Sequence, residues 1–156
     1  MPKKSAGLLL YRKTPQSGFE ILLVHPGGPF WRNKDANAWT IPKGEFDDDE
    51  DPLNAARREF EEETGQPAPA GDYIALKPVK QANNKIVHGW AVEGDFDPES
   101  LKSNTFVTEW PPRSGRQQEF PEVDRAAWFT PEIAKEKILK GQERIIDELL
   151  ELLSHG

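Results

Sequence analysis

Three glutamates near the middle of the chain have a spacing that suits metal chemistry. Glu59, Glu62 and Glu63 are three and four positions apart, and such spacings return to the same side of an α-helix. Like charges on one helix face repel each other by roughly 0.2–0.5 kcal/mol per pair, whereas Mg²⁺ takes carboxylate oxygens and shares its other positions with phosphates. We therefore predict a metal site. The alternative is an exposed acidic helix that Arg57 and Arg58 partly neutralise.

Signals for a helix over residues 53–64 flank these glutamates. Asp51 is a favourable N-cap, Pro52 suits the first helical position, and Gly65 follows the last turn. The apolar residues of the same segment fall on a separate stripe, which predicts the face that packs on the core: Leu53, Ala56 and Phe60.

Apolar runs between turn signals predict the strands that must position this helix. The predicted strands are Ala6–Tyr11, Glu20–His25, Ala38–Ile41, Tyr73–Val79, Lys85–Glu93, Phe106–Trp110 and Arg125–Phe129. The first two have a turn at Pro15–Gly18 between them, and Pro42-Lys43-Gly44 ends the third. A second helix is predicted to begin at Thr130-Pro131-Glu132 and a third after Gly141. Strands with helices on both faces of a mixed sheet make an α/β (α+β) fold.

The residues around the central helix follow an ordered pattern. Its members stand in the order G-x5-E-x7-R-E-U-x-E-E-x-G, where U is bulky and apolar: Gly44, Glu50, Arg58, Glu59, Phe60, Glu62, Glu63 and Gly65. This pattern resembles the box of the Nudix hydrolase family, with one departure at Gln66, where the family usually has an apolar residue. The resemblance implies an α/β/α sandwich with a mixed β-sheet, a single domain over residues 1–156, and Mg²⁺ as cofactor, with Mn²⁺ as a substitute.

The resemblance also implies a role for each matching residue. Glu59, Glu62 and Glu63 match the family's metal-binding glutamates. Arg58 matches the arginine that orients them through charge-assisted hydrogen bonds. Glu50 matches a residue that supports the box structurally, as Gly65 does.

The residues that precede the box glutamates are expected to meet the phosphates. The carbonyl oxygen of Lys43 stands where the family can coordinate metal, and the lysine side chain is expected to contact a phosphate or remain in solvent. The loop that begins at Gly44 is expected to supply backbone groups near the phosphates.

One more carboxylate is expected from the loop before the last helices, because family members often add one there. Glu122 stands in that place, and Glu119 and Asp124 are its competitors. We predict that the loop folds over the N-terminal part of the box helix, which would carry Trp110 toward the substrate. Glu122 would then be a metal ligand or the general base, and Glu62 is the other candidate base. Otherwise Glu122 pairs with a loop arginine or faces solvent.

The substrate is less closely defined than the chemistry. Phe30 and Trp31 lie in a predicted loop, and Trp110 stands where a predicted strand gives way to a loop. These rings either stack on a base, an interaction of roughly 1–3 kcal/mol, or close the core. The segment 103–122 is similar to a bacterial subgroup of predicted nucleoside triphosphate pyrophosphohydrolases. We expect hydrolysis of a diphosphate bond in a nucleoside triphosphate or a dinucleoside polyphosphate. The alternative is a catalytically silent Nudix domain that senses a nucleotide or a protein.

The charge and composition of the chain limit the kinds of molecule that it is expected to bind. The net charge of −7 disfavours a general grip on a nucleic acid duplex and leaves a small phosphorylated nucleotide as the expected partner. No run of about 18 apolar residues is present, so no membrane helix is predicted. The chain lacks cysteine and a recognisable signal peptide, so we expect a cytoplasmic protein. The sequence does not indicate an oligomeric state.

Overall fold

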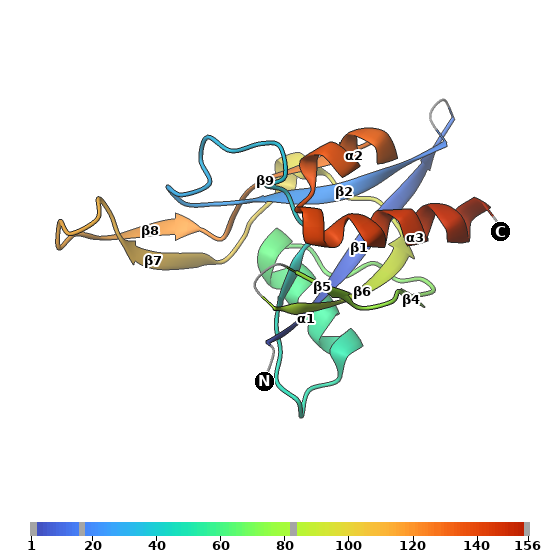
Figure 1. Ribbon diagram of the computed structural model, residues 1–156, viewed down its shortest axis with the longest axis horizontal. Coiled ribbons are helices and arrows are strands. Elements are labelled where there is room, and N and C mark those ends of the chain that lie inside the picture. The colour runs from blue at the N-terminus through green and yellow to red at the C-terminus, as the bar shows by residue number, and fades with distance from the viewer. Residues whose placement is uncertain (1–2, 16–17, 82–83, 155–156) are drawn as a thin grey trace.

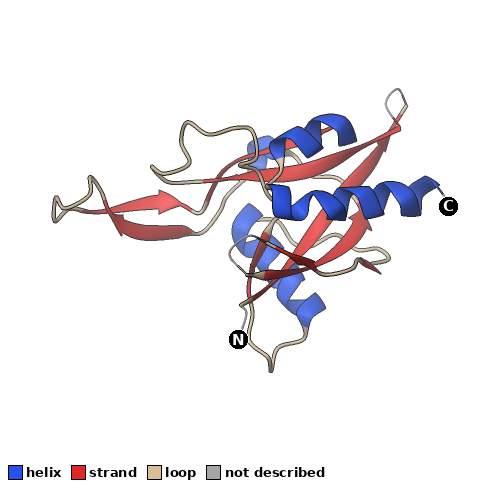
Figure 2. Ribbon diagram, viewed as in Figure 1, coloured by secondary structure: helices blue, strands red, loops and turns tan. Residues whose placement is uncertain are grey.

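A central mixed sheet with helices on both faces forms the body of the protein (Figures 1 and 2). The computed structural model describes residues 3–15, 18–81 and 84–154. In chain order the elements are β1 Lys4–Thr14, β2 Gly18–Pro26, β3 Lys43–Glu45, α1 Pro52–Thr64, β4 Ile74–Ala75, β5 Val79–Lys80, β6 Ile86–Glu93, η1 Pro98–Ser100, β7 Thr105–Glu109, β8 Gln117–Pro121, β9 Val123–Phe129, α2 Pro131–Lys137, η2 Lys140–Gln142 and α3 Glu143–Ser154.

The main sheet has the strand order β4-β6-β1-β2-β9. Strand β1 runs parallel to β6 and antiparallel to β2, and β9 is antiparallel to β2. Helix α1 covers one face, while α2 and α3 cover the other. The predicted α/β sandwich with a mixed sheet is confirmed.

Strand β1 explains why the sheet needs both helical layers. Leu8 and Leu10 are fully buried in the cluster that contains Phe60 of α1. Leu9, which alternates with them, is buried in the cluster formed with α2 and α3. Because successive side chains of a strand point to opposite faces, the continuous apolar run 8–10 gives each face its own core.

Strands β1 and β2 pair next to the turn that joins them and diverge farther from it. Residues 39–45, which precede α1, lie between the diverging parts of the two strands. The two strands pair only at Tyr11–Thr14 with Gly18–Ile21. Further along, Thr40 bridges to Val24 in β2, and β3 pairs with β1 through the Gly7 to Lys43 register. The wedge formed by residues 39–45 therefore places the box loop between the two central strands.

The predicted strand Ala38–Ile41 is wrong. Trp39 and Thr40 make isolated bridges to different partners, Ile138 and Val24, and the regular strand of this region is Lys43–Glu45. The cause is the wedge itself, because a segment between two diverging strands cannot follow one ladder along its whole length.

Helix α1 follows its local signals. The Asp51 side chain accepts a hydrogen bond from the Asn54 amide at 3.0 Å. Gly65 ends the helix in the left-handed region at φ 77°, where glycine is favoured. The predicted apolar face is correct at Ala56 and Phe60, whereas Leu53 is only half-buried.

The remaining predictions vary in accuracy. The predicted strand Tyr73–Val79 is two short strands, β4 and β5. Strand β8 was not predicted, because Gln-Gln-Glu-Phe-Pro lacks alternating apolar residues; it pairs with β7 in a separate two-stranded sheet. Residues 16 and 17 of the predicted turn lie outside the described residues. In the described part of the chain, no helix is long and apolar enough to cross a membrane.

The wedge predicts unequal effects for two glycines that face each other across β1 and β6. A methyl group at Gly7 would lie 2.5 Å from the Pro42 carbonyl oxygen, whereas one at Gly89 would have only contacts of 3.8 Å. We expect Gly7→Ala to lower the free energy of unfolding by about 1–3 kcal/mol and Gly89→Ala to leave it unchanged or raise it by up to about 1 kcal/mol. Urea denaturation measures both, and equal effects would contradict the wedge.

Candidate active site

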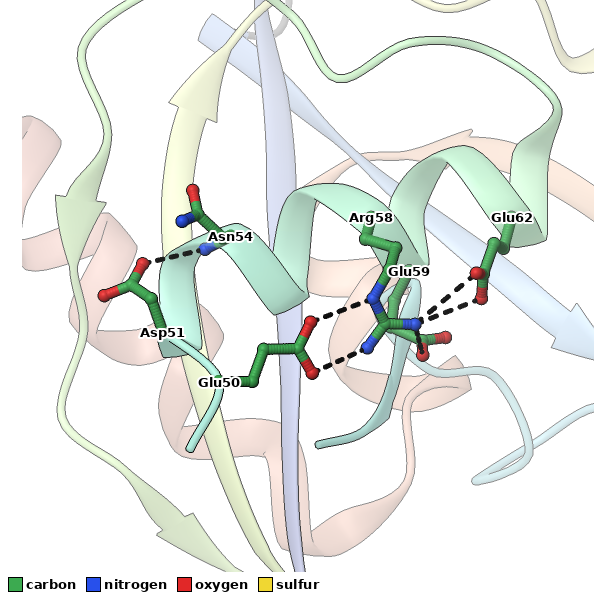
Figure 3. Close-up of polar contacts among 6 residues, drawn as sticks. All are labelled: Glu50, Asp51, Asn54, Arg58, Glu59 and Glu62. Carbon is green, nitrogen blue, oxygen red and sulfur yellow. Dashed lines mark hydrogen bonds and ion pairs between the residues drawn. The ribbon is translucent and has the colours of Figure 1, made fainter. Parts of the chain in front are cut away.

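Arg58 is the hub of the acidic face of α1 (Figure 3). Its Nε and Nη2 atoms each donate to the Glu50 carboxylate at 3.0 Å. Its Nη1 atom donates to Glu59 at 2.8 Å and reaches the Glu62 carboxylate at 3.4 Å. The hydrogen bonds to Glu50 raise the pKa of Arg58 above its ordinary value. The bidentate pair fixes the guanidinium, which in turn holds Glu59 and Glu62 beside each other.

Glu59 lies directly against the backbone of β3. A methyl group at position 44 would lie 2.0 Å from a Glu59 carboxylate oxygen, so only glycine leaves room for this carboxylate. The Glu59 side chain is 12% exposed. Burial raises its pKa, and the neighbouring charge of Glu62 adds to the effect. Gly44 therefore acts by close approach, and β3 with α1 forms the walls around Glu59.

Glu63 is the most deeply buried of the three box glutamates. It accepts a hydrogen bond from the Lys43 amide at 3.2 Å, and burial raises its pKa to about 8. Desolvation lowers the pKa of the Lys43 ammonium, which the charges of Glu63 and Glu59 partly offset. The ammonium group of Lys43 therefore interacts with the charges of the box carboxylates. The backbone amide of Lys43 holds the Glu63 carboxylate by a hydrogen bond.

Glu122 is tied to the end of α1 by consecutive backbone hydrogen bonds. The Asn104 amide donates to the Glu62 carbonyl at 2.9 Å, and the Glu122 amide donates to the Asn104 carbonyl at 2.8 Å. Burial raises the pKa of both Glu59 and Glu63, and the charge of Glu122 adds to both shifts. The structure therefore brings Glu122 near the box glutamates.

The route by which this segment approaches differs from the predicted one. We expected it to fold over the N-terminal part of the box helix, but it contacts the last turn, where the Lys102 amide also donates to the Thr64 carbonyl. The last carbonyls of a helix lack intrahelical donors, and this segment supplies them. Trp110 is not carried over the helix, because β7 and β8 extend away from it (Figure 1).

The competitors of Glu122 have other surroundings. Asp124 lies 2.8 Å from Nδ1 of the fully buried His25, whose Nε2 lies 2.6 Å from the Lys34 carbonyl oxygen. A bulge makes this possible: His25 pairs with Arg125 and Pro26 with Val123, which leaves Asp124 as the extra residue. Glu119 is exposed on β8.

The His25–Asp124 pair was not predicted from the sequence. A histidine at the end of an apolar strand was the only local signal, and its partner is 99 positions away. The pair joins β2 to the segment that carries Glu122, so we regard it as support for the site.

The donor set fits a hard divalent cation. Glu59, Glu62, Glu63 and Glu122 bring four carboxylates to one region, where Arg58 is the cation that directly contacts two of them. Two of these carboxylates are largely withdrawn from water, and a cation would stabilise their charged forms. Within residues 3–15, 18–81 and 84–154, no three acidic or histidine side chains converge at ligand distance. Glu59 and Glu62 turn to Arg58 instead, and Glu63 turns to the Lys43 amide.

The three aromatic residues that were expected either to stack on a base or to close the core lie in two places. Trp31 packs against the core cluster of α2 and α3, with the Lys34 ammonium 5.2 Å from its ring centre. Phe30 and Trp110 form an edge-to-face pair with centroids 5.4 Å apart, and Phe30 is 60% exposed. Trp31 therefore closes the core, while the other two rings remain together near the surface.

The buried Glu63 predicts a pH-dependent stability of the metal-free protein. Its folded-state pKa of about 8 exceeds the ordinary value of 4.5, so the folded state retains a proton that the unfolded state loses. The contribution of Glu63 to the free energy of unfolding is fully present below about pH 4.5 and is lost as the pH rises toward 8. Relative to Glu63→Gln, we expect wild type to lose at most about 1.4 kcal/mol per pH unit in that window. Urea titrations in excess chelator measure this difference, and a flat difference would contradict the assignment.

Comparisons with known proteins agree with this architecture. The NUDIX domain family model matches residues 1–149. No curated protein sequence matches the chain. A Caenorhabditis elegans Ap4A hydrolase in a binary complex has a TM-score of 0.68 at 21% identity, with 97% of this chain and 99% of that chain covered. The NUDIX domain of Shewanella oneidensis NrtR, crystallised with ADP ribose, has a TM-score of 0.64 at 16% identity, with 98% of this chain and 89% of that chain covered.

A mutT/nudix family protein from Listeria innocua is similar in the same way, with a TM-score of 0.63 at 16% identity and coverage of 99% and 96%. At these identities the structural likeness shows the fold, and the family model shows the relationship. With its glutamate helix, its mixed sheet and this match over nearly the whole chain, the protein belongs to the Nudix family of pyrophosphohydrolases.

Proposed function

We propose that this protein, acting as one domain, uses Mg²⁺ to hydrolyse a diphosphate bond in a nucleoside diphosphate linked to another group. The observation that carries the proposal is the gathering of box carboxylates with Glu122, from a distant segment, at the last turn of α1. A solvated acidic helix would not need buried glutamates, a glycine that clears space for one of them, or a fourth acid tied to its end.

Each residue has a distinct part in the proposed reaction. A bound divalent cation would lower the pKa of water and counter the charge of the leaving phosphate. Glu59, Glu62, Glu63 and Glu122 would hold the ion, with the Lys43 carbonyl as a further oxygen ligand. Arg58 would orient Glu59 and Glu62. The Lys43 side chain and the loop from Gly44 would contact the phosphates.

Glu62 and Glu122 are the candidates for the general base. The Glu62 side chain is 41% exposed, against 12% for Glu59, and its contacts with Arg58 are long. It is therefore the box carboxylate most available to accept a proton from the attacking water. Glu122 is also exposed and can take either role.

The proposed substrate is a nucleoside triphosphate or a dinucleoside polyphosphate. Structural neighbours include an Ap4A hydrolase and a NUDIX domain crystallised with ADP ribose, which supports a nucleotide with a phosphoanhydride bond. Mn²⁺ is the expected substitute for Mg²⁺, and the proposed location is the cytoplasm. The alternative, a catalytically silent sensor domain, would bind a nucleotide or a protein without hydrolysing any substrate.

A panel of nucleoside triphosphates, dinucleoside polyphosphates and ADP ribose tests this proposal. With Mg²⁺ or Mn²⁺ we expect products cleaved at a diphosphate bond, because the site consists of hard oxygen ligands. Excess chelator should abolish turnover, and products resolved by mass identify the bond. Turnover that persists in chelator, or none on any substrate with either metal, would overturn the proposal.

Variants of the candidate bases test the residue roles. Glu62→Gln keeps the size of the side chain and removes its charge and basicity, so we expect kcat to fall at least about 100-fold. Glu122→Gln should also lower kcat, while both proteins keep their urea midpoints. Glu119→Gln is the matched control, because Glu119 is an exposed glutamate on β8, three residues before Glu122. Full activity of Glu62→Gln, or equal losses in Glu122→Gln and Glu119→Gln, would contradict the assignments.

A further inference from the structure

A two-stranded arm extends from the candidate active site. Strands β7 and β8 form a sheet of their own and project away from the main sheet (Figures 1 and 2). The root of the arm is at the site, because the Asn104 amide bonds to the Glu62 carbonyl and the Glu122 amide bonds to Asn104. A free two-stranded hairpin is marginally stable in water, so the arm needs packing along its length.

The loop 27–37 supplies that packing on one face. A methyl group at Gly28 would lie 2.7 Å from the Phe106 ring, and one at Gly27 would lie 2.0 Å from the Pro121 carbonyl oxygen. These contacts show that the loop backbone lies directly on the arm. The Gly27 amide also donates to the Glu122 carbonyl at 2.9 Å. The loop and the hairpin therefore form one unit, and backbone hydrogen bonds of Glu122 join them at the root of the arm.

The outer end of this unit carries the Phe30–Trp110 pair. The rings meet edge to face, with an interplanar angle of 77°, and Phe30 is 60% exposed, so part of the ring surface remains open. Arg32 follows Phe30 by two residues, Arg113 and Arg116 lie in the turn after Trp110, and all three are exposed. In the part of the chain that the structure describes, none of these three arginines makes a side-chain ion pair, whereas Arg12 and Arg58 do.

The opposite face of the arm differs. Val107 alternates with Phe106 along β7 and is 60% exposed, with Glu119 as its register partner on β8. The face toward the loop carries the two aromatic rings, and the three exposed arginines stand within six positions of one of them in the chain. This combination suits a nucleobase with attached phosphates, because bases stack on aromatic rings and unpaired arginines attract a polyanion to an otherwise acidic protein.

The pair lies well away from the carboxylates. Trp110 is five positions along the strand from Thr105, whose partner Pro121 precedes Glu122. At about 3.4 Å per residue, Trp110 is roughly 17 Å from Thr105 along the strand, whereas Phe30 is three residues from Gly27, whose amide bonds to the Glu122 carbonyl. A base stacked there belongs to the part of the substrate farthest from the cleaved bond. A second nucleoside, joined through several phosphates, fits this position.

We propose that the arm binds the distal nucleoside of a dinucleoside polyphosphate, with its base on Phe30 and Trp110. This inference rests on the proposed function and selects one of its two substrate classes. Phe30 and Trp110 are then specificity-determining residues, which favour a substrate with a nucleoside at each end over one with a free terminal phosphate.

Steady-state kinetics with Mg²⁺ on diadenosine tetraphosphate and ATP tests the proposal, with ATP followed as a substrate or as a competitive inhibitor. Phe30→Ala and Trp110→Ala should each raise KM for diadenosine tetraphosphate about 10-fold, the scale of one lost stacking contact, and leave kcat within about twofold. The constants for ATP should not change. Val107→Ala is the matched control, since it truncates an exposed side chain on the other face of β7.

Three outcomes overturn the proposal: equal effects of the aromatic variants on both nucleotides, the same effects in Val107→Ala, or an aromatic variant that acts by changing the oligomeric state in sedimentation. A wild-type protein that hydrolyses other members of the substrate panel but not diadenosine tetraphosphate also overturns it, while the proposed hydrolase function stands.

Fluorescence separates this proposal from the hydrolase proposal, because it needs no turnover. Diadenosine tetraphosphate should quench indole emission of wild type. Trp110→Phe should raise the KM less than Trp110→Ala does, since phenylalanine still stacks, and should lose most of the quenching. If wild type hydrolyses nothing but this quenching pattern appears, the arm still binds the nucleotide and only the hydrolase proposal fails. Absence of quenching in wild type at saturating nucleotide would overturn the role of the arm.

Discussion

The burial of closely spaced carboxylates is the constraint around which this protein is arranged. Glu59, Glu62 and Glu63 share one helix end, and Glu122 approaches from another segment. Removing a carboxylate from water costs several kcal/mol when its charge is not compensated, and a domain of this size is stable by only about 5–15 kcal/mol in total. The raised pKa of Glu63, to about 8, is the direct sign of that cost.

The fold offsets this cost by giving α1 two unlike sides. Phe60 and Ala56 are buried against β1, and they hold the helix in place with apolar contacts that do not involve the acids. Arg58 then distributes one positive charge among Glu50, Glu59 and Glu62. The acids therefore remain crowded because the opposite face of the same helix packs well.

The divergence of β1 and β2 brings the other parts to the helix. It admits residues 39–45, so that the Lys43 amide reaches Glu63 and Gly44 allows Glu59 to lie against the strand. At the far end of β2, the bulge opposite Pro26 turns Asp124 toward His25 and leaves Glu122 at the root of the arm. The divergence of β1 and β2 thus serves the box, and the bulge between β2 and β9 serves the distal acid.

The sequence by itself determined the features that depend on neighbours within a few residues. The cap at Asp51, the stop at Gly65 and the common face of the three glutamates follow from helical periodicity, and the apolar runs of β1 and β2 follow from burial on both faces. The box pattern also identified the family without any coordinates.

Tertiary structure decided everything that depends on partners far apart in the chain. It separated Glu122 from Asp124, which differ little in local sequence, by giving Asp124 a partner 99 positions away. It made a strand of Gln117–Pro121 by pairing it with β7 and replaced the expected strand at Ala38–Ile41 with a wedge. It also packed the partly buried Trp31 against the core while Phe30 stayed exposed. Local propensity cannot anticipate these outcomes, because hydrogen bonds and packing between distant segments form only when the whole sheet is assembled.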